Sequence, residues 1–381
     1  MVAGPPTKNR TASDRAFYRP ELDVLRFFAF FGVFLFHFSR PVDLYVRYGV
    51  PRPVAAMVNG LMQGGVYGVD LFFVLSAYLI TALLLREKER FGDVDVPRFY
   101  GRRILRIWPL YFSFIGLACL PLFNQDGALT WKYVAAFLLL AGNWSIVAWG
   151  WPGNSIINPL WTISIEEQFY LLWPPMFRKT SRDRLLWRAG AMLAVSFLTR
   201  GALVAMHGGQ YSAWCNTLAR LDPIAFGIAV AALTHDRMPT LGGSTRAGML
   251  MLGIVMLTLV ANFWKIHGPE TLEWIPTLVG FPVVAAGATF ILLSVLGISA
   301  RPPRFLIYLG KISYGLYVYH ALGNLLSSWL IPVRAEFIQL ALRPIAALAI
   351  TIALASASYA LLERPFLRVK SKLARIRSRP V

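Results

Sequence analysis

Apolar runs separated by short basic segments make up almost the whole chain. Each run is about 17 to 25 residues long, the length that an α-helix needs to cross a bilayer. Their boundaries predict ten spans, at residues 22–40, 64–85, 107–123, 160–177, 189–206, 214–234, 247–264, 275–297, 311–330 and 339–361. The pattern therefore predicts an all-α polytopic membrane protein of about ten transmembrane helices, without a separate soluble domain.

One further apolar stretch, Trp131–Trp149, does not fit as a span. If it crossed the bilayer, the basic segment at 178–188 would face outward, against the positive-inside rule. We therefore predict a re-entrant or interfacial segment, whose backbone polar groups need protein or water around them.

Basic residues indicate which ends of the spans face the cytoplasm. Lys and Arg gather in the segments 86–106, 178–188, 235–246 and 301–311 and in the tail from residue 364. The positive-inside rule places these segments in the cytoplasm. Because the number of spans is even, both chain ends lie on the cytoplasmic side. We therefore predict cytoplasmic basic tails at 1–20 and 365–381, on either side of a transmembrane domain at 21–364. The first run carries two ionisable residues and lacks a cleavage site, which favours a retained helix over a signal peptide.

Composition agrees with a membrane protein and excludes other classes. The 381 residues are 56% apolar, with a net charge of +19 and a mean hydropathy of +0.54. Because the positive charge follows the topology, we expect membrane lipids as partners and no nucleic acid. Cys119 and Cys215 lie in or beside apolar runs and form neither a disulfide framework nor a metal motif, so no metal is expected.

Two ionisable residues share the first predicted helix. Arg26 and His37 are separated by eleven positions, which returns them to nearly the same face about 16 Å apart along the axis. An ionisable side chain in hydrocarbon costs about 2.5 kcal/mol or more, so each one is a candidate functional residue. The alternative is a snorkelling arginine and a hydrogen-bonded buried histidine.

The second span begins with a glycine-rich segment. Gly64, Gly65 and Gly68 allow close approach of a ligand or of another backbone, and Asp70 adds a carboxylate in the outer half that is a candidate for substrate binding. Helix packing is the alternative explanation for these glycines.

A second carboxylate lies at the depth expected for His37. Glu166 lies about 9 Å below the outer end of the fourth span by helical rise. A carboxylate beside an imidazole orients the ring and supports its protonated form, as a general base requires. The neighbouring Glu167 could take this role instead.

Three more polar residues lie in later spans. Arg220 and Asp222 belong to the sixth span and His320 to the ninth, and all three are candidates for substrate binding. Alternatively, Arg220 and Asp222 neutralise one another and His320 is a satisfied core histidine.

Arginines crowd the inner end of the third span. Arg103 and Arg106 place two guanidinium groups one helical turn apart, a geometry that suits phosphates. A phosphorylated cofactor or anionic lipid headgroups would fit equally well.

Five stretches carry recognisable patterns in a fixed order. They are Asp-Val-Leu-Arg at 23–26 with Phe-His-Phe at 36–38, Gly-Val-Asp-Leu-Phe-Phe-Val-Leu-Ser-Ala-Tyr at 68–78, Arg-Arg-Ile-Leu-Arg-Ile-Trp-Pro at 102–109, residues 161–170, and Ile-Ser-Tyr-Gly-Leu-Tyr at 312–317 before a histidine at 320. Together they resemble the acyltransferase 3 family of membrane-bound acyltransferases, over nearly the whole chain from about residue 20 to 366.

This resemblance implies a ten-helix membrane enzyme of the bacterial inner membrane. It would take an acyl group, commonly acetyl, from acyl-CoA on the cytoplasmic side. The acceptor would be a hydroxyl of a glycan, a lipid-linked sugar or a secondary metabolite.

The resemblance also implies roles for single residues. By position, His37 matches the family's catalytic histidine and Glu166 the glutamate of a tryptophan-containing motif. Arg26, together with Arg103 and Arg106, matches residues linked to the donor, and Gly64, Gly65 and Gly68 match a glycine motif. Ala77 departs from a common glycine, and the chain ends at Val381 without an appended hydrolase-like domain, so we expect no second transfer step in this polypeptide.

These observations give one mechanistic hypothesis and one rival. The nucleotide end of coenzyme A would lie near Arg103 and Arg106, with the thioester near His37. Glu166 would orient His37, which removes the proton from the acceptor hydroxyl. The rival is a transporter or flippase, because a polar path through ten helices could also carry a substrate; no inverted repeat supports it.

Overall fold

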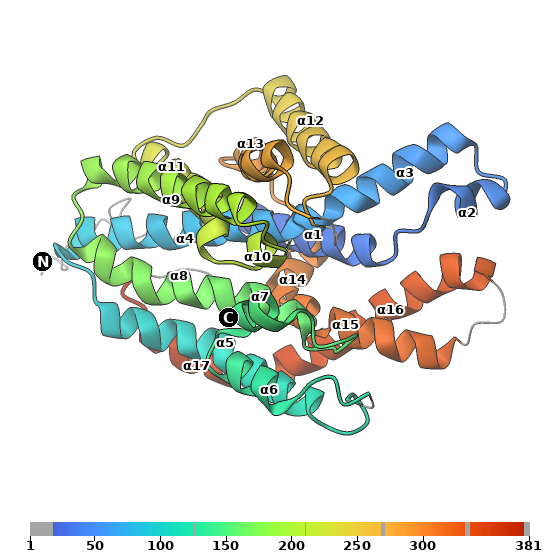
Figure 1. The fold of residues 1–381 in the computed structure, drawn as a ribbon. Coiled ribbons are helices and arrows are strands. Elements are labelled where there is room, and N and C mark those ends of the chain that lie inside the picture. The colour runs from blue at the N-terminus through green and yellow to red at the C-terminus, as the bar shows by residue number, and fades with distance from the viewer. Residues whose placement is uncertain (1–17, 125, 210, 268–270, 332–335, 377–381) are drawn as a thin grey trace, which may run out of the picture.

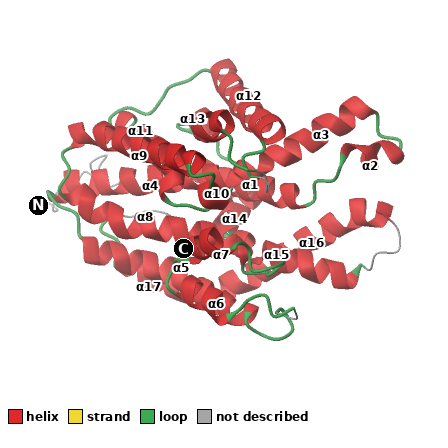
Figure 2. Ribbon diagram, in the orientation of Figure 1, coloured by secondary structure: helices red, strands yellow, loops and turns green. Residues whose placement is uncertain are grey.

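The computed structural model describes residues 18–124, 126–209, 211–267, 271–331 and 336–376. These residues form helices and loops, with no strand among them (Figure 2). The helices are α1 (Pro20–His37), α2 (Val42–Arg47), α3 (Arg52–Gly64), α4 (Gly68–Phe91), α5 (Val96–Ala118), α6 (Trp131–Leu138), α7 (Gly142–Trp149), α8 (Trp161–Arg178), α9 (Leu185–Ala205), α10 (Tyr211–Trp214), α11 (Leu221–Leu233), α12 (Gly243–Leu259), α13 (Phe281–Val295), α14 (Arg304–Lys311), α15 (Ser313–Leu330), α16 (Glu336–Ser358) and α17 (Arg364–Lys372). The all-helical prediction is therefore confirmed for the described part of the chain.

Helices α1 and α4 lie at the centre of the bundle. Helix α4 packs against α11 and α13 on one side and against α8 on the other, while α1 packs against α4, α14 and α15 (Figure 1). Helices α9 and α12 complete the first side, and α5 and α17 complete the second. Residues from α1, α4, α5, α8 and α15 can therefore converge in the interior.

Glycines allow α1 and α4 to cross at close range. A Cβ atom added at Gly65 would lie 2.2 Å from the carbonyl oxygen of Gly32, and one added at Gly68 would lie 2.2 Å from that of Ala29. A Cβ atom added at Gly64 would lie 3.1 Å from the hydroxyl oxygen of Thr258 and 3.2 Å from its backbone, which is a tight contact but not a collision. The structure thus places Gly65 and Gly68 at a helix crossing, where a side chain would collide with backbone. This packing accounts for the two glycines, and the expected role of the three glycines in donor binding stays a prediction.

The predicted count of ten spans is not confirmed. By length and apolar composition, five helical segments in the described residues can cross a membrane: Arg52–Phe91, Arg182–Ala205, Gly243–Trp264, Pro276–Val295 and Leu340–Lys372. The other five predicted spans fall on helices α1, α5, α8, α11 and α15. Helix α11 has only 13 residues, about 20 Å of rise, which is short of the roughly 30 Å hydrocarbon core.

Two segments differ from simple spans. The stretch Trp131–Trp149 forms two helices of eight residues each, α6 and α7. Each has about 12 Å of rise, so neither crosses a bilayer.

Helix α3 was not predicted. It runs through a 3₁₀ turn into α4, and its N-terminal Pro51 and Pro53 are suited to a helix start. The α2–α3 and α15–α16 hairpins project together from the end opposite the described N-terminus (Figure 1).

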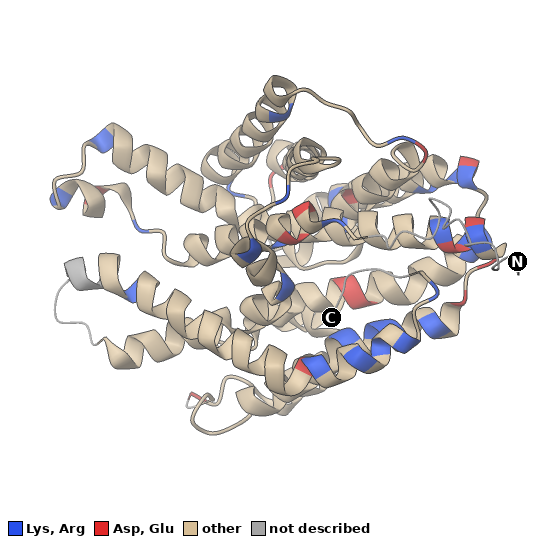
Figure 3. Cartoon of the chain, turned by 180° about the vertical axis from the view of Figure 1, so that it is seen from behind, with Lys and Arg blue, Asp and Glu red and all other residues tan. Residues whose placement is uncertain are grey.

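Lys and Arg gather at the end of the bundle that holds the described N-terminus and along α17 (Figure 3). The proposed C-terminal tail begins as α17, which packs on α5, and Arg102 donates to the carbonyl of Leu373 at 3.2 Å. Residues 1–17 and 377–381 of the two expected tails lie outside the described residues.

Candidate functional site

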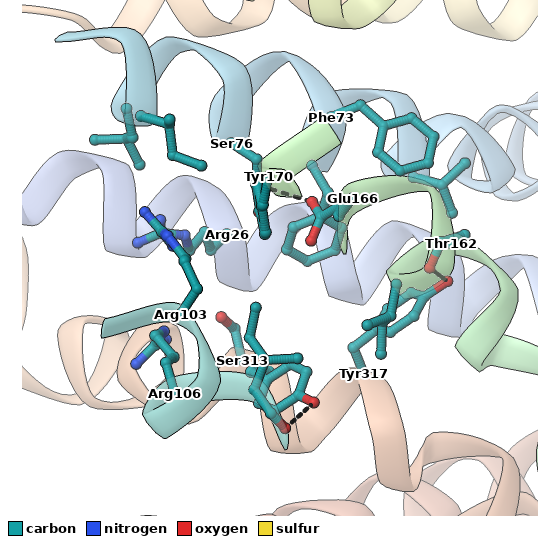
Figure 4. A pocket seen from close by; sticks show the side chains of 17 residues that line it. Arg26, Phe73, Ser76, Arg103, Arg106, Thr162, Glu166, Tyr170, Ser313 and Tyr317 are labelled. Atoms are coloured by element: carbon teal, nitrogen blue, oxygen red, sulfur yellow. Dashed lines mark hydrogen bonds between the residues drawn. The ribbon is translucent and has the colours of Figure 1, made fainter. Parts of the chain in front are cut away.

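A narrow pocket of about 90 Å³ lies among α1, α4, α5, α8 and α15. Three predicted arginines, Arg26 from α1 with Arg103 and Arg106 from α5, gather at one end of it (Figure 4). Thr162 and Tyr317 lie at the other end. We name this space the arginine pocket.

Two of these guanidinium groups have no acidic partner among the described residues. Arg26 pairs with Asp23 at 3.2 Å, whereas no ion pair or hydrogen bond forms to Arg103 or Arg106 within that part of the chain. The guanidinium of Arg103 lies 4.9 Å from the ring centroid of Tyr170 and 5.4 Å from that of Phe99. Both rings hold this cation in place while leaving its donors available for an anion.

Glu166 lines the same pocket. It accepts a hydrogen bond from the Ser76 hydroxyl at 2.7 Å, while Glu167 accepts one from the Trp108 indole at 2.9 Å and does not line the pocket. At the far end the Thr162 hydroxyl donates to the phenolic oxygen of Tyr317 at 2.9 Å.

A wider cavity of about 500 Å³ adjoins this pocket, and we name it the histidine cavity. It is lined by three histidines, His37, His267 and His320, and by three tryptophans, Trp151, Trp161 and Trp214, with amide and hydroxyl groups between them. Flat aromatic faces with polar groups between them suit an organic ligand that carries hydrogen-bonding groups of its own. His267 lies in the loop after α12, where burial and the nearby Lys265 lower its pKa to about 4, so its ring is neutral at physiological pH.

His37 and His320 lie side by side in this cavity. Their ring centroids are 5.2 Å apart. The Nδ1 of His320 is 2.5 Å from the carbonyl oxygen of Tyr317, which can only accept, so Nδ1 carries the hydrogen and the neutral ring keeps a lone pair on Nε2. That Nε2 is buried without a hydrogen-bond partner in the described residues.

The structure does not bring His37 and Glu166 together. His37 lines the histidine cavity and Glu166 the arginine pocket, and no hydrogen bond joins them in the described chain. Depth along two helices placed both residues at one level, but the sequence gives no information on which direction each side chain faces. His37 lies beside His320, from α15, instead.

The pocket and the cavity share a wall. Val69 and Tyr317 line both spaces. The arginine pocket and the histidine cavity therefore lie end to end, separated by these two side chains.

Asp70, Arg220 and Asp222 form two buried ion pairs, with partners that were not expected. Arg220 binds Asp70 at 3.0 Å, and Asp222 binds Arg200 from α9, with one contact at 3.0 Å. All four side chains are at most 2% exposed, and none lines the pocket or the cavity. The suggested Arg220–Asp222 pair is therefore wrong, because each residue binds a different partner. The substrate role of Asp70, Arg220 and Asp222 stays a prediction, and their ion pairs favour a structural role.

The sequence analysis missed Arg200, although an arginine within a predicted span is itself a signal. It also missed Ser76, Tyr170 and Tyr317, which carry no charge and therefore do not stand out in an apolar run. Within the described residues, no group of three or more His, Cys, Asp or Glu side chains could hold a metal ion.

Comparison with known proteins identifies the family of this arrangement. The model of the acyltransferase domain family, acyltransferase 3, matches residues 19–362. The chain is 27% identical to a "Putative O-acetyltransferase SAS0844" from Staphylococcus aureus (strain MSSA476), over 94% of this chain and 59% of the relative. It is also 27% identical to O-acetyltransferase OatA from Staphylococcus aureus (strain NCTC 8325 / PS 47), over 80% of this chain and 50% of that protein. The chain thus spans between half and three-fifths of these relatives. No solved structure matches it significantly.

Proposed function

This chain belongs to the acyltransferase domain family, and we propose that it is a membrane O-acyltransferase that moves an acetyl group from acetyl-CoA to a hydroxyl of a carbohydrate-containing acceptor. One observation carries the proposal. A pocket with two guanidinium groups that have no acidic partner in the described part of the chain meets, at Val69 and Tyr317, a wider cavity that holds two adjacent imidazoles.

The arginine pocket suits the donor. Arg103 and Arg106 would bind phosphates of coenzyme A, because their N–H groups donate to no described residue and a phosphate accepts several hydrogen bonds. The pocket is narrow, which suits the pantetheine arm. Arg26 and Glu166 line its course, and Glu166 would counter part of the positive charge there while its carboxylate stays hydrogen-bonded to Ser76.

The histidine cavity suits the acceptor. His37 would accept the proton of the acceptor hydroxyl as the oxygen attacks the thioester carbonyl. The tetrahedral oxyanion then collapses, the carbon–sulfur bond breaks, and the thiolate takes the proton from His37, which yields the ester and free coenzyme A. His320 borders the same reaction space with an acceptor nitrogen, so it would bind the acceptor or support His37.

Topology completes the proposal. The basic end of the bundle would lie in the cytoplasm with both chain ends, in a bacterial inner membrane, and about ten helices would surround the two spaces. The donor would then come from the cytoplasm, and the histidine cavity would open toward the other side, where the α2–α3 and α15–α16 hairpins project (Figure 1).

The test compares His37→Gln with His207→Gln, an identical change at an exposed loop histidine outside both spaces. Purified proteins receive acetyl-CoA and a glycan acceptor, and thiol release and product mass are measured. We expect His37→Gln to lower the transfer rate by about 10²–10⁴ while leaving acetyl-CoA affinity unchanged, and His207→Gln to keep the wild-type rate. Normal transfer in His37→Gln, or passage of acceptor across vesicles without thiol release, would contradict the proposal.

A further inference from the structure

Arg343 is a cation in the histidine cavity that has no acidic partner among the described residues. It lies on α16 and lines the cavity, and it forms no ion pair with the described residues. Its Nη2 donates to the amide oxygen of Asn324 at 3.2 Å, and its Nε is buried without a hydrogen-bond partner there. A guanidinium in such a place is incompletely satisfied by the protein itself.

The surroundings of Arg343 present hydrogen-bond donors. A guanidinium only donates, so the Asn324 amide turns its oxygen toward Arg343 and leaves its NH₂ group for another acceptor. Arg40, in the loop after α1, is close enough to interact electrostatically with Arg343. No Asp or Glu occurs among the described residues that line the cavity.

We infer that this part of the cavity binds an anionic group, a carboxylate or phosphate, carried by the acceptor. Arg343 and the Asn324 amide would bind its oxygens, and Arg40 would add long-range attraction. The acceptor hydroxyl would then be oriented toward His37, on the same cavity. This inference rests on the proposed function for the name of the ligand, but the binding that it requires is independent of turnover.

Binding of charged and neutral sugars tests the inference. The full-length protein, in discs of zwitterionic lipid and without acetyl-CoA, is titrated with two matched pairs: methyl glucuronoside with its methyl ester, and glucose 6-phosphate with glucose. We expect the anionic member of at least one pair to bind about tenfold or more tightly, as charge-assisted hydrogen bonds imply. Arg343→Gln should reduce that ratio to about one, and Arg343→Lys should retain part of it.

Arg52→Gln is the matched control, because Arg52 is an exposed arginine that pairs with Asp43 and lines neither space; it should keep the wild-type ratio. Misfolding would weaken both members of a pair, whereas loss of the anion site changes their ratio. Equal affinity within both pairs for the wild type, including no binding at all, overturns the inference, as does a ratio that survives Arg343→Gln. Displacement of the anionic sugar by phosphatidylglycerol in the discs would assign the site to a lipid headgroup and also overturn it. His37→Gln should keep the preference, so failure of the catalytic proposal is distinguishable.

Discussion

Replacement of Arg103 by Gln tests where the donor binds. The guanidinium of Arg103 is fixed between Tyr170 and Phe99 and has no acidic partner among the described residues, so its charge is available to a ligand. A hydrogen bond to a charged group contributes about 1.5–3 kcal/mol. Its loss should raise the KM for acetyl-CoA by about 10- to 150-fold, with a much smaller effect on kcat because the reacting carbonyl lies elsewhere.

The assay compares two donors. Acetyl-CoA carries the phosphates, whereas acetyl-pantetheine has the same thioester and lacks them. Arg103→Gln should reduce kcat/KM for acetyl-CoA and leave kcat/KM for acetyl-pantetheine nearly unchanged, so the preference for the full cofactor falls. Arg98→Gln is the control on the same helix, because Arg98 is 54% exposed and pairs with Asp95; such a pair contributes little, and its loss should change neither value by more than about twofold.

Two results would refute this reasoning. If Arg103→Gln lowered kcat/KM equally for acetyl-CoA and acetyl-pantetheine, the arginine would act on folding or on the thioester and not on the nucleotide. If Arg98→Gln and Arg103→Gln had the same effect, only the general positive potential of this end of the molecule would matter, and the pocket would have no special role.

Two further predictions concern stability, measured by thermal unfolding in detergent. Arg200→Met should lower the free energy of unfolding by about 3–5 kcal/mol, because it leaves the Asp222 carboxylate buried without its cation. The double variant Arg200→Met with Asp222→Asn should recover much of that loss. If the effects of the two substitutions were simply additive, the pairing would be contradicted. Gly68→Ala should cost about 1–3 kcal/mol, because its Cβ would lie 2.2 Å from the carbonyl of Ala29, whereas Gly116→Ala meets open space and should be neutral or slightly stabilising.

The sequence predicted the positions of the helices better than it predicted how many of them cross the membrane. Every predicted span overlaps a helix, since long apolar runs satisfy their backbone only as helices. The spans at 160–177 and 214–234 were less clear cases. Helix α8 carries two glutamates and Pro174–Pro175, and α11 is short, so neither has the length and composition of a separate crossing. Such helices are covered by neighbours, which a hydropathy pattern does not show.

The sequence indicated which polar residues lie inside the bundle, but it did not indicate which of them contact one another. Arg26 was singled out as an ionisable residue within a span, and Arg103 and Arg106 by their spacing of one helical turn; the three line one pocket. Helical rise gives only the depth of a residue along the helix axis. Rotation about the helix axis and the identity of the neighbouring helix decide what a side chain meets. For this reason the expected Glu166–His37 contact is absent from the described structure, and His320 from α15 lies beside His37 instead.

Five arginines inside the predicted spans or at their ends fall into two groups, according to whether the structure gives them an acidic partner. Arg200 and Arg220 are fully buried and each binds an aspartate from another helix, so their charges hold helices together and leave no capacity for a ligand. Arg103, Arg106 and Arg343 have no acidic partner in the described residues, and each faces a cavity. Because an uncompensated charge next to hydrocarbon is costly, a ligand that supplies the missing negative charge would lower the free energy of the bound state. The two groups of positive charge lie in adjoining spaces, Arg103 and Arg106 in the arginine pocket and Arg343 in the histidine cavity. The charges therefore suggest that both reactants are held by anionic groups remote from the reacting atoms, with the thioester and the hydroxyl meeting between them at Tyr317 and His37.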